Sequence, residues 1–362
     1  MQVLAKPTRF LLFLFLLFGG LYIARTVLIP LAIGGLLAAL FSSVCDCLEK
    51  RGVNRGMATL LCIVCFVLVV SGIVLLLALQ SSDLVKNMDD IKQRLTAFME
   101  PIRQFVSTTL GIEPQEQKAI VAKQTSDGGS LSSIIKTVIE SVMGVLVDLV
   151  LILVYTYLLL YFRGHLKGFI LRLVAKNRQT EAREVIDQSS EVAQRYLIGL
   201  FTIIAMLWVL YGVGFTIVGV KQAVFLAILC GLLEMIPFIG NLTGSLLAVL
   251  VSLAQGGDSR VVLGILVVYG IVQFTQTYLI EPLVVGNEVS INPLFTILVI
   301  VVGEAVWGVS GMILALPALG VVKVICDHVE PLKPYGFLIG QEKPEKESSG
   351  MVDKLKHLLR KA

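Results

Sequence analysis

Residues 223–254 read AVFLAILCGLLEMIPFIGNLTGSLLAVLVSLA, and residues 293–322 read PLFTILVIVVGEAVWGVSGMILALPALGVV. As one straight helix, either run would extend over about 45 Å at 1.5 Å per residue, whereas the hydrocarbon core of a bilayer is about 30 Å thick. Each run contains helix-breaking residues near its middle: Pro237 and Gly240 in the first, and Gly303, Gly308 and Gly311 in the second. Non-helical backbone is tolerated at that depth only where protein buries it or water reaches it. The two runs therefore predict broken or re-entrant membrane segments.

Each break also carries a carboxylate, Glu234 in the first run and Glu304 in the second. A charged group is costly inside a bilayer, so an intramembrane carboxylate marks a candidate functional site. Paired segments interrupted by Gly or Pro point to the binding site of a membrane transporter. We therefore expect Glu234 or Glu304 to bind a proton or a cation during transport. The alternative is that each carboxylate caps backbone amides at the broken helix, where the helix dipole favours an anion.

The composition is that of a multipass membrane protein. The 362-residue chain is 56% hydrophobic and only 15% charged, with a mean hydropathy of +0.87, whereas about 25% charged residues are usual in soluble domains. The net charge of +4 is small and scattered, so the lipid bilayer, and not nucleic acid, is the expected partner. We predict an all-α polytopic fold with about eight apolar segments, two of them broken or re-entrant in the carboxy-terminal half.

The positions of Lys and Arg predict the topology. A short basic loop with Lys50, Arg51 and Arg55 separates the second and third apolar segments, and the positive-inside rule places it in the cytoplasm together with both termini. The segments expected from this topology are 1–79 (three transmembrane helices), 80–140 (an extracytoplasmic helical insertion), 141–162 (a fourth transmembrane helix), 163–195 (a cytoplasmic amphipathic linker), 196–327 (the transport core with two broken segments) and 328–362 (a cytoplasmic tail).

The extracytoplasmic insertion carries an apolar stripe. From Leu84 to Phe105, apolar residues recur at alternating spacings of four and three, which is a heptad pattern over three repeats. Such a stripe needs burial. Either residues 131–142 of the same chain cover it, or a second subunit does, in which case the stripe contributes to a homo-oligomer.

Motifs of other protein classes are missing or incomplete. The chain has no GxxxxGK[ST] sequence for direct ATP drive and no HExxH sequence. The CxxC formed by Cys62 and Cys65 lacks a second pair and a nearby histidine, and the three histidines are dispersed. We therefore expect no enzyme, no metal site and no cofactor. A channel or pore remains the alternative from another class, because broken helices also line pores.

The order of segments suggests an internal pseudo-repeat. Residues 197–254 comprise a crossing helix followed by a broken segment, and residues 261–326 repeat that order. Two re-entrant hairpins entering from opposite faces would explain this pattern, and kinked spanning helices are the alternative. Tyr269, Gln273 and Gln276 share one helix face, which either forms interhelical hydrogen bonds or lines a pathway. The candidate residues of the substrate or ion pathway are Glu234, Pro237, Gly240, Asn241, Gln273, Gln276, Glu281, Glu304, Gly308 and Gly311.

Four strings carry a resemblance to a known family: YLIG at 196–199, LLEMIPFIG at 232–240, QTYLIEPLVVGNEVSINPLF at 276–295 and GEAVWGVSGMILALP at 303–317. The chain resembles the autoinducer-2 exporter family of multipass transporters, from RTVLIP in its first segments to about Asp327. The resemblance implies eight or so membrane segments, a homo-oligomer, and export or exchange of small solutes. Named activities of the family are export of a quorum-sensing furanone and exchange of sodium or lithium for protons.

The resemblance implies that the protein is a secondary transporter of the bacterial inner membrane, which does not use ATP directly. The expected cargo is a small solute such as a quorum-sensing autoinducer, and sodium(lithium)/proton antiport is the alternative. The subunit number is open, with a pentamer as the guess. Many relatives have a histidine where this chain has Ile291, Asn292 and Pro293, so a role of that histidine in proton coupling does not carry over. The family pattern maps onto Glu234, Pro237, Gly240, Glu281, Pro282, Gly286, Pro293, Gly303, Gly308, Gly311 and Pro317.

Overall fold

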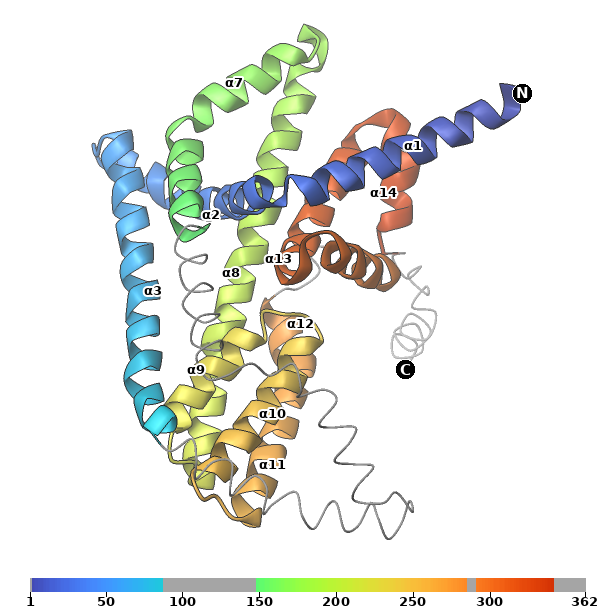
Figure 1. Cartoon of the computed structure of the whole chain (residues 1–362). Coiled ribbons are helices and arrows are strands. Elements are labelled where there is room, and N and C mark those ends of the chain that lie inside the picture. The colour runs from blue at the N-terminus through green and yellow to red at the C-terminus, as the bar shows by residue number, and fades with distance from the viewer. Residues whose placement is uncertain (1, 87–147, 285–290, 342–362) are drawn as a thin grey trace, which may run out of the picture.

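A computed structural model describes residues 2–86, 148–284 and 291–341 of the chain (Figure 1). Nearly all of these residues are helical, and no strand occurs among them apart from one isolated β-bridge between Ile291 and Gly340. The fold is therefore that of an all-α polytopic membrane protein, as the sequence predicts. Most of the insertion expected at 80–140, Gly286 and the tail from residue 342 lie outside the described residues.

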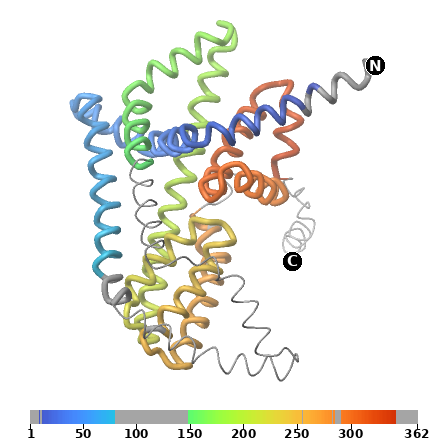
Figure 2. Tube along the Cα trace, viewed as in Figure 1, coloured from blue at the N-terminus to red at the C-terminus, as the bar shows by residue number. Residues whose placement is uncertain are grey.

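The first three helices are α1 (Gln2–Ile23), α2 (Arg25–Lys50) and α3 (Arg55–Lys86). Only Ala24 separates α1 from α2, and Figures 1 and 2 show both helices running across the direction of α3. A small apolar core joins α2 and α3 to the helix Asp148–Tyr161. Its buried members are Ala38, Cys45, Cys62 and Leu160.

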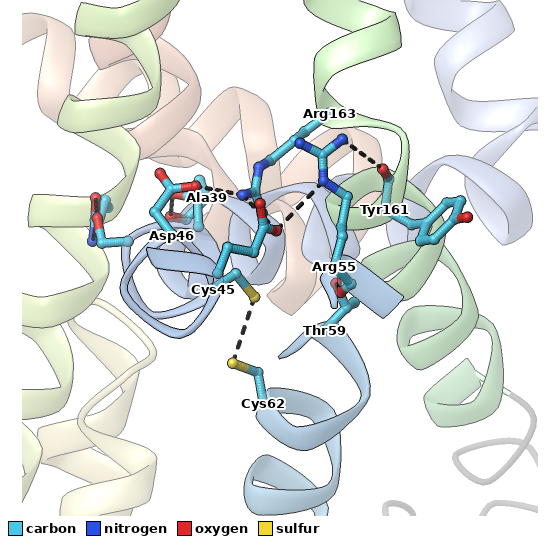
Figure 3. Close-up of polar contacts among 12 residues, drawn as sticks. Ala39, Cys45, Asp46, Arg55, Thr59, Cys62, Tyr161 and Arg163 are labelled. Carbon is cyan, nitrogen blue, oxygen red and sulfur yellow. Dashed lines mark hydrogen bonds and ion pairs between the residues drawn. The ribbon is translucent and has the colours of Figure 1, made fainter. Parts of the chain in front are cut away.

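The helix Asp148–Tyr161 is followed by α7 (Arg163–Leu173), whose axis is bent by 66° from it. Arg163, the first residue of α7, forms ion pairs with Asp46 and Glu49 of α2, the second at 2.9 Å (Figure 3). Glu49 also pairs with Arg55 of α3 at 3.4 Å. These ion pairs link the start of α7 to the end of α2 and the start of α3.

A short 3₁₀ turn, η1 (Lys176–Arg178), leads into the longest helix, α8 (Gln179–Val218). Its 40 residues extend over about 60 Å at 1.5 Å per residue. The boundary expected at residue 195 between linker and transport core lies inside this uninterrupted helix. α8 ends at Gly219, whose φ of 82° favours glycine because a side chain is strained in the left-handed region.

The first broken segment is a helical hairpin made of α9 (Ala223–Leu233) and α10 (Ile239–Ala254). The arms are about 16 and 24 Å long at 1.5 Å per residue, so neither spans a core of about 30 Å. They run back along each other, since the Cys230 thiol donates to the Gly244 carbonyl at 3.6 Å. At the open end, Gln255 Nε2 donates to Gln222 Oε1 at 3.0 Å.

After this hairpin, α11 (Ser259–Thr275) runs into a π-helical turn, η2 (Gln276–Ile280), and then into α12 (Glu281–Val284). The Asp258 side chain caps α11 by accepting a hydrogen bond from the Val261 amide at 3.1 Å. The main core of the protein packs α8, α9 and α11 together. Its fully buried members include Leu207, Tyr211, Phe215, Leu226 and Ile265.

The second broken segment is α13 (Pro293–His328), which contains a sharp break at Gly308, with φ 61° and ψ −141°. Asn292 caps its start, accepting from the Leu294 amide at 2.9 Å. The chain folds back at the break, because a Cβ added to Gly303 would lie 2.5 Å from the Gly311 carbonyl oxygen. A turn, η3 (Glu330–Leu332), and α14 (Lys333–Ile339) then pack on α13.

Both broken runs are therefore helical hairpins and not kinked spanning helices. Figure 1 shows α9 and α10 beside the lower part of α8 and α13 beside its upper part. Within the described chain, five helices are long and apolar enough to cross a membrane when α13 is counted as one helix across its break at Gly308. The number is six if Asp148–Tyr161 and α7 count as one span. The other apolar helices in this part, Leu12–Ile23, Ala223–Leu233 and Ile239–Leu253, are shorter.

Candidate functional site: two helix breaks and a buried polar cluster

The first break keeps two helix ends in close contact. α9 ends at Leu233 and α10 begins at Ile239, and Phe238 between them has a positive φ of 64°. A Cβ at Gly240 would overlap the Leu233 carbonyl oxygen. Glycine is needed here because the two backbones approach too closely for a side chain. Pro237 lies in the same break, where it cannot donate a helical hydrogen bond.

Glu234, at the end of α9, faces two polar residues of the next helical unit. It is partly buried, and its carboxylate lies beside the Gln276 side-chain amide and within electrostatic range of Glu281. Gln276 is only 6% exposed, and its Nε2 donates to Glu281 Oε1 at 3.3 Å. A buried amide of the π-turn η2 is thus placed between two carboxylates.

Gln273 and Gln276, which the sequence places on one polar face of α11, make contacts with different residues. Gln273 accepts a hydrogen bond from Asn241 Nδ2 of α10, and its own Nε2 donates to Thr277 Oγ1 at 3.4 Å. These contacts join α10 to α11, as interhelical amides do in membranes. Gln276, one turn further on, belongs to the carboxylate cluster instead.

Three buried polar atoms of this region have no hydrogen-bond partner in the described part of the chain: Tyr211 Oη, Tyr269 Oη and Gln276 Oε1. The two tyrosine rings lie 4.8 Å apart, and both side chains are within electrostatic range of Glu234. Each unsatisfied group costs several kcal/mol in an apolar environment. The region around Glu234 can therefore bind water, an ion or a polar solute more favourably than its apolar surroundings can.

The second break lies close to the first, but its carboxylate does not join the cluster. Ile236, in the first break, packs against the apolar contact between the arms of α13, formed by Ile300, Met312 and Ala315. Glu304 is exposed, and its side chain makes no hydrogen bond or ion pair with the described residues. The neighbouring Trp307 instead donates to the Leu21 carbonyl of α1 at 3.0 Å.

The structure thus assembles Glu234, Gln276 and Glu281, places Asn241 and Gln273 beside them as an interhelical pair, and leaves Glu304 apart. Sequence reasoning missed Tyr211, because it occurs in the long helix α8, where a single aromatic residue in an apolar stretch is ordinary core. The described residues contain no group of three or more His, Cys, Asp or Glu side chains that could hold a metal ion.

The chain is similar to known transport proteins over most of its length. Residues 11–330 match the sequence model of the AI-2E family transporter. The chain is 25% identical to YueF, a candidate transport protein of Bacillus subtilis, over 82% of this chain and 83% of the relative. It is 25% identical to PerM, a candidate permease of Escherichia coli, over 85% and 89%. It is 26% identical to MT0215, a candidate transport protein of Mycobacterium tuberculosis, over 86% of each.

The family match covers far more than half of the chain and includes both helical hairpins and the polar cluster around Glu234. The apolar helices that surround this cluster are those of an integral membrane protein. The protein is therefore a membrane transporter that belongs to the AI-2E family.

Proposed function

We propose that the protein is a secondary transporter that exports or exchanges a small solute using an ion gradient, with the Glu234 cluster on the pathway. The observation that carries this proposal is the set of unpartnered buried polar atoms beside two carboxylates, at a helix break among apolar helices. A solute with hydrogen-bonding groups would satisfy Gln276 Oε1 and the two tyrosine hydroxyls. The family relationship makes a quorum-sensing autoinducer one candidate solute.

The same cluster supports a second candidate function, sodium or lithium exchange for protons. The carboxylates of Glu234 and Glu281 and the unpartnered Oε1 of Gln276 are oxygen ligands, which hard cations prefer. Two neighbouring carboxylates can also share a proton, because like charges at short range do not both ionise readily. Ion exchange and solute export can use one site if the ion and the solute bind alternately.

Transport by purified protein in proteoliposomes tests this proposal. We expect saturable uptake of at least one solute from a panel of autoinducers and other small polar compounds, dependent on an imposed sodium or proton gradient. Flux that rises linearly with concentration and ignores the gradient would show a channel instead. No flux of any solute or ion above that of protein-free vesicles would contradict the transport proposal for this site.

We also propose that the protein assembles as a homo-oligomer in the bacterial inner membrane, with both termini in the cytoplasm. The proposed oligomer rests on the apolar stripe between residues 84 and 105, most of which lies outside the described residues. The proposed topology rests on the short basic loop with Lys50, Arg51 and Arg55. A stripe of that size is unusual on the exposed surface of a monomer. A pentamer is the working assumption for the subunit number.

Replacing Ile91, Leu95 and Phe98 by serine is expected to shift the detergent-solubilised protein to smaller species, because the substitution removes the apolar surface between subunits. Size-exclusion chromatography with light scattering measures the change. Cysteines introduced at positions 91 and 98 should crosslink between chains. Crosslinks confined to single chains would show that residues 131–142 of the same chain cover the stripe.

A further inference from the structure

The short helix α7 begins where a membrane helix ends. Only Phe162 separates Arg163, the first residue of α7, from Tyr161, the last residue of the helix Asp148–Tyr161. Transmembrane helices tilt on average by about 20° from the bilayer normal. A helix bent by 66° from such a span runs closer to the membrane plane than to the normal. This direction suits a helix that lies along a bilayer surface, and the 11 residues of α7 extend over about 16 Å.

One face of α7 is apolar and uncovered. Leu166, Phe169, Ile170 and Leu173 are exposed by 40, 57, 43 and 71%, and no residue of α7 is buried. With about 3.6 residues per turn, these four side chains fall within an arc of about 100°. Such an arc is the apolar face of an amphipathic helix. Nothing in the described protein packs over it, although α8 lies along another side of α7.

The polar side of α7 is basic and partly fixed to the protein. Residues 163–178 contain five Lys or Arg and no Asp or Glu. Arg163 pairs with Asp46 and Glu49 of α2 (Figure 3), and Lys167 pairs with Asp187 of α8. At about 100° per residue, Arg163 and Lys167 lie on one flank of the apolar arc. Their ion pairs fix that flank to α2 and α8 and leave the arc itself exposed. The three remaining basic residues, Arg172, Lys176 and Arg178, are exposed and form no ion pair within the described part.

We propose that α7 and the turn after it form a binding site for anionic phospholipid at the leaflet where the helix Asp148–Tyr161 ends. The arc of Leu166, Phe169, Ile170 and Leu173 enters the boundary between headgroups and acyl chains, as interfacial amphipathic helices do. Arg172, Lys176 and Arg178 then contact headgroup phosphates. Each basic residue near an anionic leaflet contributes favourably over a range of about one Debye length. Charge complementarity selects the anionic lipid over a zwitterionic one.

A tryptophan scan of the intact protein in vesicles tests the position of the apolar arc. Phe169→Trp lies within the arc, and Gly168→Trp lies on the opposite side of α7 at a position where an added side chain meets open space. Trp208 and Trp307 give a constant background that the unsubstituted protein measures. With lipids brominated on their acyl chains, we expect several-fold stronger quenching of the added tryptophan at position 169 than at position 168.

Equal quenching at both positions would overturn the proposal. A blue-shifted but unquenched emission at position 169 would also overturn it, since another subunit rather than lipid would then cover the face.

Charge substitutions test the preference for anionic lipid. Adding phosphatidylglycerol to phosphatidylcholine vesicles is expected to increase the quenching at position 169, and added salt is expected to reduce that increase. Combining Arg172→Gln, Lys176→Gln and Arg178→Gln should abolish the increase while the quenching in pure phosphatidylcholine persists. Arg183→Gln is the matched control, because it removes an exposed arginine of α8 outside the basic stretch. An increase that survives the triple substitution, or that is lost equally in the control, would refute the headgroup contacts.

Discussion

Glu234→Gln is expected to lower gradient-driven transport about tenfold or more, which corresponds to about 1.4 kcal/mol on the rate-limiting barrier. Glutamine keeps the size and hydrogen-bonding capacity of the side chain but cannot take up or release a proton, and it gives a cation no negative charge. The effect should be specific to function, because the Ile239 and Gly240 amides at the start of α10 donate to backbone carbonyls and not to the Glu234 side chain. Initial rates in proteoliposomes at several pH values measure the loss.

Glu304→Gln is the matched comparison for Glu234→Gln. It makes the same chemical change in the second hairpin, but Glu304 is exposed and lies outside the polar cluster. We therefore expect a much smaller loss of transport. If both variants keep the rate and pH dependence of the unsubstituted protein, neither carboxylate takes part in coupling. If Glu304→Gln alone abolishes transport, the pathway runs along α13 and not through the Glu234 cluster.

Gly311→Ala is expected to destabilise the second hairpin strongly. The added Cβ would overlap the carbonyl oxygen of Gly303, and a backbone atom cannot move aside as a flexible side chain does. Overpacking of this kind costs about 1–3 kcal/mol, so less protein should reach the membrane and the remainder should unfold at lower temperature. Gly240→Ala should behave similarly, because its Cβ would overlap the Leu233 carbonyl oxygen.

Two other glycines serve as controls for this effect. Gly270 on α11 has open space around its Cβ position, so Gly270→Ala should leave expression and melting temperature nearly unchanged. Gly308 also has open space but a φ of 61°, so Gly308→Ala adds backbone strain without a collision. Melting temperatures in detergent, read from intrinsic fluorescence, rank the variants. Equal stability of Gly311→Ala and Gly270→Ala would show that the arms of α13 leave room for a Cβ between Gly311 and the Gly303 carbonyl oxygen.

The sequence predicted that the two runs are broken, because Pro237 in one run and three glycines in the other interrupt apolar stretches that are too long for one span. Which of Gly303, Gly308 and Gly311 carries the second break became clear only from the structure, where it is Gly308. Glycine and proline act through the local backbone, so their effect is visible without knowledge of the fold. The choice between hairpins and kinked spans depended on contacts such as that between Gly303 and Gly311, which are eight residues apart. Spacing alone leaves such a contact undetermined.

The polar cluster was only partly predictable. The helical spacing grouped Gln273 with Gln276, but the structure assigns them to different contacts, because the π-turn η2 begins at Gln276 and shifts the helix face. Glu234 meets Gln276 only through the packing of α9 on the following helices. The continuity of α8 across residue 195 was also hidden, since the sequence changes there from amphipathic to apolar without a helix breaker.

The continuous helix α8 has a mechanical consequence. It contains no proline, and it contacts α2 and α7 of the amino-terminal part of the chain as well as α9, α11 and α13 of the carboxy-terminal part. Such an unbroken helix rotates as a rigid body and does not bend at an internal hinge. Over its length of about 60 Å, a tilt of about 5° moves one end by about 5 Å relative to the other. A small rotation at the α7 end would therefore become an ångström-scale displacement beside the first hairpin.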